Sequence, residues 1–218
     1  MSLPVEQILP RLHKALAHGH AVLSSPPGSG KTTRIPLALL DAPWLQGRKI
    51  IMLEPRRPAA RMAARYMAHL LDEAVGGTVG YQVRMERRIG SHTRIEVLTE
   101  GLLVRRLQSD PELSGVGPII FDEFHERSLQ ADLGLALCLD ICSSLREDLR
   151  LLVMSATLDE QAVADLLGGA VVTSDGDLPP VDIRHLGRSV GRDILPATRR
   201  LVLQGATGRH FGLPAGQG

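Results

Sequence analysis

Short apolar runs alternate with longer segments of mixed polarity along most of the chain. The apolar runs predict strands at residues 21–23, 50–53, 79–83, 95–98, 119–121, 151–154 and 170–172. Segments with helical spacing of apolar positions predict helices at residues 31–40, 58–71, 102–108, 131–145 and 160–167. Because the predicted strands are separated by helices, we expect an α/β fold in which helices cover both faces of a parallel sheet.

The string SPPGSGKTT at residues 25–33 lies between the first predicted strand and the helix that follows it. Glycines in such a turn let backbone N–H groups surround phosphate oxygens, while Lys31 adds a positive charge and Thr32 a hydroxyl for Mg²⁺. Ser25 replaces the first glycine of the full G-x-x-x-x-G-K-[ST] pattern, so a loop that only caps a helix remains the alternative. The candidate nucleotide-binding residues are Gly28, Ser29, Gly30, Lys31, Thr32 and Thr33.

The string FDEFHER at residues 121–127 ends another predicted strand and contains two adjacent acids. Nucleotide hydrolysis needs one carboxylate that holds the metal and a second that orients and deprotonates water, and we assign these roles to Asp122 and Glu123. Taken alone, the two acids could also be solvated residues at a strand end. Together with the phosphate loop they predict an ATP hydrolysis site that uses Mg²⁺, with Lys31 among its catalytic residues. The candidate metal ligands are Thr32, Asp122 and Glu123.

The chain resembles the DEAH-box branch of superfamily 2 helicases, and within it the bacterial HrpB-type enzymes, because Phe replaces the usual Ala in the acidic box. Further strings resemble motifs of this family in the expected order: LEPRR at 53–57, GYQVR at 80–84, TEG at 99–101 and SAT at 155–157. The resemblance covers residues 5–185. It implies a P-loop NTPase fold with a RecA-like sheet, which forms one lobe of a two-lobe motor.

The family resemblance also implies roles for residues at the other strand ends. Contacts with a nucleic-acid backbone are implied for Pro55, Arg56, Arg57, Thr99, Glu100 and Gly101, and less directly for Arg84. His125 is implied to be a catalytic residue that links the acidic box to the coupling motif and the facing lobe. The residues of that coupling motif are Ser155, Ala156 and Thr157.

The position of these motifs predicts where they meet. The family implies that the strand at 151–154 lies between the strands at 21–23 and 119–121. Every motif with a catalytic or coupling role follows a predicted strand, and the carboxyl ends of parallel strands share one edge of a sheet. We therefore expect the motifs to converge on that edge.

The composition is nearly charge-balanced, with 25 Lys and Arg against 24 Asp and Glu among 218 residues. The chain therefore has no overall excess of positive charge that would indicate nucleic-acid binding. Any surface that contacts RNA or DNA must be local. The chain has only three Phe, two Tyr and one Trp, which favours sequence-independent binding of a single-stranded RNA or DNA backbone over base stacking. The first 20 residues mix charged and apolar positions, so we expect a cytoplasmic location and no membrane partner.

The last segment departs from the family pattern. We expect residues 1–185 to form the ATP-binding lobe and residues 186–218, rich in Gly, Arg and Pro, to form a poorly ordered tail with a short helix at 197–203. A second lobe, whose arginines would complete the ATP site, is not recognisable, so we expect this chain alone to be a weak ATPase. A module that only binds nucleotide or nucleic acid remains the alternative. The motifs at 99–101 and 155–157 disfavour an unrelated P-loop NTPase or kinase.

Overall fold

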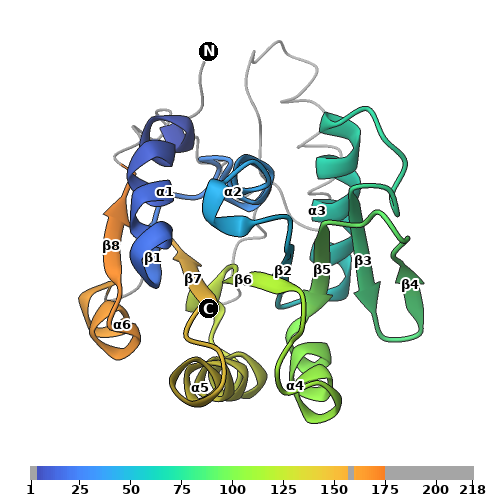
Figure 1. Ribbon diagram of the computed structural model, residues 1–218. Helices are drawn as coiled ribbons and strands as arrows, with labels where there is room; N and C mark the ends of the chain where they lie inside the picture. The colour runs from blue at the N-terminus through green and yellow to red at the C-terminus, as the bar shows by residue number, and fades with distance from the viewer. Residues whose placement is uncertain (1–3, 157–159, 175–218) are drawn as a thin grey trace, which may run out of the picture. The chain divides into compact units, whose positions relative to one another are not determined.

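The computed structural model describes residues 4–156 and 160–174. Within them, eight strands form one sheet in the order β4-β3-β5-β2-β6-β7-β1-β8 (Figure 1). The strands are β1 (Ala21–Ser24), β2 (Lys49–Glu54), β3 (Val79–Val83), β4 (Glu86–Arg88), β5 (Ile95–Thr99), β6 (Val116–Phe121), β7 (Arg150–Ser155) and β8 (Ala170–Thr173). The helices are α1 (Leu9–His18), α2 (Lys31–Leu39), α3 (Arg57–Leu70), α4 (Glu100–Ser109), α5 (Leu129–Ser144) and α6 (Glu160–Leu167). Short 3₁₀ turns cover Pro4–Ile8, Pro43–Leu45 and Phe124–Glu126.

Helices cover both faces of the sheet, as predicted. Helices α1, α2 and α3 lie on one face, and α4, α5 and α6 lie on the other (Figure 1). Along β1, Ala21 and Leu23 belong to the apolar cluster beneath the first set of helices, whereas Val22 belongs to the cluster beneath the second. This alternation follows the two-residue period of a strand, and it explains why the central strands have consecutive apolar residues between their ends.

Strand β7 lies between β1 and β6, which confirms the strand order that the family resemblance implies. It runs parallel to both neighbours, with Ser155 paired to Ser24 and Val153 paired to Phe121. Because these strands share one direction, the segments that follow β1, β6 and β7 leave the sheet at the same edge. The fold thereby brings the phosphate loop, the acidic string and the SAT string together.

The sequence pattern does not predict two of the elements in the structure. Strand β4 pairs antiparallel with β3, so the sheet is mostly rather than entirely parallel. All three residues of β4 are charged and provide no apolar run, so its pairing depends on the turn that follows β3. Helix α1 buries Leu12 and Leu16, which lie one turn apart. The charged residues between and around them interrupt the apolar spacing, so the sequence pattern does not indicate this helix clearly.

Some expectations from the sequence lie outside the described residues. They concern Thr157, the domain boundary at residue 185, and the tail with its short helix at 197–203. Among the helices of residues 4–156 and 160–174, none is both long enough and apolar enough to span a membrane.

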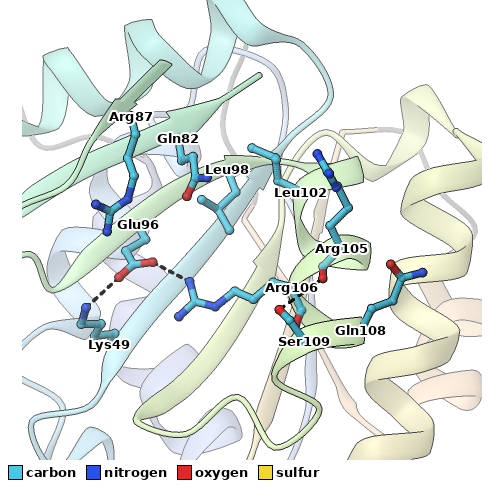
Figure 2. Close-up of a pocket in the computed structure, with 10 residues that line it drawn as sticks. All are labelled: Lys49, Gln82, Arg87, Glu96, Leu98, Leu102, Arg105, Arg106, Gln108 and Ser109. Carbon is cyan, nitrogen blue, oxygen red and sulfur yellow. Dashed lines mark hydrogen bonds and ion pairs between the residues drawn. The ribbon is translucent and has the colours of Figure 1, made fainter. Parts of the chain in front are cut away.

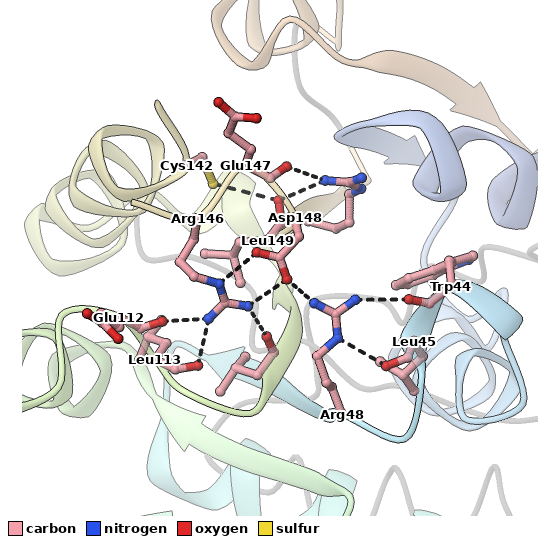
Figure 3. Close-up of polar contacts among 12 residues, drawn as sticks. Trp44, Leu45, Arg48, Glu112, Leu113, Cys142, Arg146, Glu147, Asp148 and Leu149 are labelled. Atoms are coloured by element: carbon pink, nitrogen blue, oxygen red, sulfur yellow. Dashed lines mark hydrogen bonds and ion pairs between the residues drawn. The ribbon is translucent and has the colours of Figure 1, made fainter. Parts of the chain in front are cut away.

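A network of two arginines and one aspartate ties together loops at the amino ends of β2, β6 and β7 (Figure 3). Arg146 Nε donates to Asp148 Oδ1 at 2.7 Å, and the same guanidinium donates to the carbonyl oxygens of Leu113 and Val116 at 3.0 and 2.8 Å. Arg48 pairs with the other carboxylate oxygen of Asp148. The hydrogen bond from Arg146 lowers the pKa of Asp148 to about 2. These contacts fix the loops at the edge of the sheet opposite the phosphate loop.

Candidate functional site

The phosphate loop connects β1 to the first residue of α2. Gly28 and Gly30 have φ values of 78° and 90°, in the left-handed region that strains any residue with a Cβ. Gly30 immediately precedes α2, and the first N–H groups of a helix have no acceptor within the helix. Those N–H groups and the helix dipole favour an anion at this point. The local backbone is therefore suited to phosphate.

The Lys31 side chain is buried although it is charged, with a relative exposure of 3% for the residue. Its Nζ lies 3.1 Å from Oε1 of Glu123, which follows β6. His125 Nδ1 lies 3.4 Å from the second carboxylate oxygen of Glu123. The structure thus brings the lysine of the phosphate loop together with the acid and the histidine of the second string.

The backbone at the acidic string is strained. Glu123 has φ 50° and ψ 36°, the left-handed conformation that non-glycine residues rarely adopt. Its N–H donates to Oδ1 of Asp122 at 2.9 Å, and its side chain pairs with Lys31. Strain of this kind gathers at functional sites, where the surrounding structure maintains it.

The Asp122 carboxylate is buried, and only one of its two oxygens has a hydrogen-bond partner among the described residues. The residue is 2% exposed, and among the described residues its Oδ2 is buried without a hydrogen-bond partner. Burial raises the pKa of Asp122 to about 6, aided by the charge of Glu123 and opposed by the Thr32 hydroxyl and by Lys31. A buried carboxylate with an unpartnered oxygen is costly unless an ion or proton compensates it.

The residues present fit Mg²⁺ bound together with a nucleotide. Magnesium prefers oxygen ligands and commonly takes one or two carboxylates or hydroxyls from the protein, with phosphate and water completing its shell. Thr32 and Asp122 offer such oxygens next to the phosphate loop. No group of three or more His, Cys, Asp or Glu residues in the described part of the chain could hold a metal by itself.

Glu54 is a further residue of the site that the sequence reasoning did not single out. It ends β2, whose Leu53 pairs with Phe121 and accepts a hydrogen bond from the Asp122 N–H at 3.1 Å. Glu54 is 2% exposed, and burial, followed by the charges of Asp122 and Glu123, raises its pKa to about 9. The available signal was an acid at the end of an apolar strand, but the neighbourhood of β2 and β6 became known only from the sheet order.

The residues expected to contact nucleic acid lie at the same edge, farther along the sheet. Arg56 is 71% exposed at the side chain and pairs with Glu126 at 2.8 Å, which joins this string to the acidic string. Arg57 begins α3 and is exposed, and Pro55 lies between it and Glu54. The edge therefore carries exposed cations beside the acidic string.

The TEG string forms the junction between β5 and α4. Thr99 ends β5, and Glu100 begins α4 and bonds to the Ser128 hydroxyl that caps α5. Gly101 follows in the first turn of α4. Arg84 is exposed after β3, where the register of β3 and β5 places it level with Glu100. Strands β2, β6 and β7 separate this group from the phosphate-loop strand.

The SAT string lies directly beside the phosphate loop. Ser155 is fully buried, and its carbonyl oxygen accepts a hydrogen bond from the Ser25 N–H at 3.0 Å. Ala156 follows at the surface of the same edge, and Thr157 lies beyond the described part of the chain. This hydrogen bond connects the phosphate loop directly to β7, so a movement of the loop backbone can displace the strand that carries this string.

Comparison with known proteins gives a consistent result. A family model described as DEAD/DEAH box helicase matches residues 6–166. The ATP-dependent RNA helicase HrpB of Escherichia coli (strain K12) is 55% identical over 187 residues, which cover 85% of this chain and 23% of that protein. An ATP-dependent RNA helicase HrpA homolog of Haemophilus influenzae is 35% identical over 186 residues, covering 84% of this chain and 14% of the relative.

A solved structure agrees with the fold. The crystal structure of Escherichia coli DEAH/RHA helicase HrpB matches with a TM-score of 0.82 at 50% identity, covering 94% of this chain and 27% of that chain. The match confirms the expected RecA-like P-loop fold and the resemblance to the HrpB-type branch. The chain spans only 23% and 14% of the two curated relatives. On the family model, the shared sequence and the shared fold, the chain belongs to the DEAD/DEAH box helicase family.

Proposed function

We propose that this chain is the ATP-binding lobe of an ATP-dependent RNA helicase and that it hydrolyses Mg²⁺·ATP when a second lobe completes the site. One observation carries the proposal: Lys31, Asp122 and Glu123, from two strings far apart in the sequence, meet at one site, where Lys31 and Asp122 are buried and Asp122 Oδ2 has no partner among the described residues. Family membership and the printed names of the relatives support the same conclusion.

Phosphate binding follows from the loop and the start of α2. The backbone N–H groups from Gly28 through Thr33, with Ser29 and Gly30 between them, surround the phosphate oxygens. Lys31 moves its ammonium group from Glu123 to the β- and γ-phosphates, where it offsets their negative charge. The buried position of Lys31 strengthens this attraction because little water screens it.

The acidic string supplies the remaining chemistry. Thr32 and Asp122 would hold Mg²⁺, with Glu123 beside them, and the bound ion supplies positive charge at the transferring phosphoryl group. Glu123 orients the attacking water and accepts its proton. His125, 3.4 Å from Glu123, helps to position this carboxylate and links it to the coupling residues Ser155, Ala156 and Thr157.

Nucleic acid binds, in this proposal, at the part of the edge farther from the phosphate loop. The motif residues there contact the backbone of single-stranded RNA or DNA, without sequence preference. These residues are Pro55, Arg56, Arg57, Arg84, Thr99, Glu100 and Gly101. A second RecA-like lobe is the partner that we infer for the SAT string, and we place the protein in the cytoplasm without a membrane partner.

Steady-state ATP hydrolysis tests the proposal. The chain of 218 residues should bind Mg²⁺·ATP but turn over slowly, because arginine residues supplied to a phosphoryl-transfer site raise rates by roughly 10³ to 10⁵. Joining the second lobe of a complete relative should restore hydrolysis that single-stranded RNA stimulates, and Glu123→Gln should abolish it. Binding without hydrolysis in the joined protein would instead establish a nucleotide-binding module.

A further inference from the structure

A second polar groove lies away from the ATP site, on the face of the sheet that α4 covers. It has a volume of about 710 Å³ and opens between α4 and strands β3, β4 and β5 (Figure 2). Four cationic side chains and one carboxylate line it: Lys49, Arg87, Arg105, Arg106 and Glu96. The lining therefore has a clear excess of positive charge in a chain that is otherwise nearly balanced.

Among the described residues that line the groove, the one carboxylate already pairs with two of the cations. Glu96 accepts from Lys49 Nζ at 2.7 Å and from Arg106 Nη1 at 2.6 Å. Burial alone would raise the pKa of Glu96, but these two hydrogen bonds lower it below its ordinary value. Glu96 thus fixes Lys49 and Arg106 against the sheet, and these three groups together still carry a net positive charge.

The other two arginines have no such partner. The side chains of Arg87, on β4, and Arg105, on α4, are exposed and make no hydrogen bond or ion pair within residues 4–156 and 160–174. They stand on opposite sides of the groove (Figure 2). A guanidinium group presents a planar set of donors that matches phosphate or carboxylate oxygens in pairs. Two free guanidinium groups facing one groove point to an anionic ligand.

We propose that this groove binds the sugar-phosphate backbone of single-stranded nucleic acid, as a second contact surface beyond the strand-end motifs. Its position supports this occupant: α4 begins at Glu100, within the TEG string, and the groove continues from Leu98 and Leu102 along the same helix. A strand that crosses the edge at Thr99 can therefore turn onto the groove without leaving the protein. The choice of nucleic acid as the polyanion rests on the proposed function.

The contact would fix the strand without reading its bases. The groove is lined by arginine and lysine groups with polar and aliphatic neighbours, and none of the described residues that line it is aromatic. Bases need aromatic faces for stacking, whereas phosphates need only charge and donors. The groove should therefore bind different sequences equally and lose affinity as salt rises.

Fluorescence anisotropy of labelled oligouridylate and of a mixed-sequence RNA, titrated with the chain over a range of KCl concentrations, tests the proposal. Removing one phosphate contact lowers the slope of log K against log[salt] by about 0.7 for a single strand, so the double variant Arg87→Ala/Arg105→Ala should lose about 1.4. The double variant Arg87→Lys/Arg105→Lys should retain most of the slope. Circular dichroism would confirm that the variants fold.

A matched control removes two exposed cations elsewhere. Arg11 and Lys14 on α1 line a hollow of about 460 Å³ beside β8, at the far end of the sheet. Their double replacement by alanine changes the net charge equally but should leave the salt slope unchanged. An equal loss of slope in both double variants would overturn the proposal, because it would show a general effect of charge.

The strand-end motifs provide the second comparison. Loss of RNA affinity in Arg56→Ala/Arg57→Ala, with no change in Arg87→Ala/Arg105→Ala, would refute the groove and leave the proposed function intact. Loss in neither variant, with ATP binding preserved, would count against the nucleic-acid part of the proposed function. Polyglutamate tests for an acidic protein segment as the occupant. If polyglutamate bound the wild type as tightly as RNA and lost this affinity in Arg87→Ala/Arg105→Ala, the proposal would be wrong.

Discussion

The ammonium group of Lys31 lies 3.1 Å from the Glu123 carboxylate, although Lys31 begins α2 and Glu123 follows β6 in a different motif. The pair satisfies a buried cation that would otherwise lack a partner in the absence of phosphate. It also occupies the carboxylate that we propose as the base for water. Entry of a phosphate would draw the lysine away and release Glu123, so that the base becomes available when substrate is bound.

Replacement of Lys31 by alanine should weaken the binding of Mg²⁺·ATP about 10- to 100-fold, because a charge-assisted hydrogen bond contributes roughly 1.5–3 kcal/mol. Isothermal titration calorimetry measures the change. Arg34→Ala, one turn later on α2 with 40% of its side chain exposed, is the control and should bind normally. Wild-type affinity in the Lys31 variant would contradict the assignment of the phosphate loop.

Glu123→Gln should lower the rate of hydrolysis in the protein completed by a second lobe by about 10²- to 10⁴-fold, the usual range for a general base. Binding of ATP should be retained or strengthened, because Lys31 no longer has a competing carboxylate. Phosphate release and calorimetry measure the two quantities separately. The control is Glu126→Gln, three residues further along, which should keep most of the activity.

Glu54→Gln should make the fold more stable at alkaline pH, by at least about 1 kcal/mol, because it removes a buried carboxyl group that must otherwise ionise. The pKa of Glu54 is raised to about 9 in the fold from an ordinary value of 4.5. Such a group favours folding fully below its unfolded pKa, and this contribution is lost as the pH rises toward 9. Urea unfolding at pH 5.5, 7 and 8.5 should therefore show a flatter profile in the variant. Glu112→Gln, at an exposed acid, should reproduce the wild-type profile.

Arg146→Ala should destabilise the protein by about 2–3 kcal/mol, because it removes charge-assisted hydrogen bonds from partly buried carbonyl groups. The carbonyl oxygens of Leu113 and Val116 lose the bonds that fix the loop before β6, and Asp148 loses its main partner. Denaturant unfolding measures the loss. Arg57→Ala, at an exposed arginine, should change stability by less than about 0.5 kcal/mol. Similar values for the two variants would show that the network contributes little.

Cys138 and Cys142 should resist alkylation in the native protein. Both are buried on α5, and burial raises the pKa of Cys138, with Cys142 adding to it, and raises that of Cys142 to about 11. Because the thiolate is the reactive form, neither thiol should react quickly at pH 7.5. A thiol reagent should find no rapidly reacting group before denaturation and both afterwards. Fast reaction of either thiol in the folded protein would contradict the described packing of α5.

The sequence predicted the parts of the fold that depend on local pattern. Apolar runs marked β1, β2, β6 and β7, and the glycines of the phosphate loop marked a turn that only their backbone freedom permits. The position of β7 between β1 and β6 followed from the family resemblance, since periodicity carries no information on the order of parallel strands. Helix α1 and the charged strand β4 lacked a local signal strong enough to be recognised.

The parts of the site that depend on contacts between strands could not be predicted. Glu54 acquires its raised pKa from acids on β6, and only the register of β2 with β6 brings them together. The pair of Arg56 and Glu126 likewise joins two motifs that the sequence treats separately. The groove lined by Lys49, Glu96 and Arg106 draws on α4 and four strands, and no motif in the sequence indicates that they meet. Such contacts arise from tertiary packing, and the local patterns of a single sequence do not indicate which elements will become neighbours.

The two edge strands of the sheet differ in a way that affects how copies of this chain meet at high concentration. Strand β4 is short and consists of Glu86, Arg87 and Arg88, so another strand placed against it would have to desolvate charged side chains. Strand β8, at the opposite edge of the described sheet, has the sequence AVVT and carries no charge. Within residues 4–156 and 160–174, charge thus protects the β4 edge against strand-to-strand aggregation, whereas the β8 edge has no charge of its own.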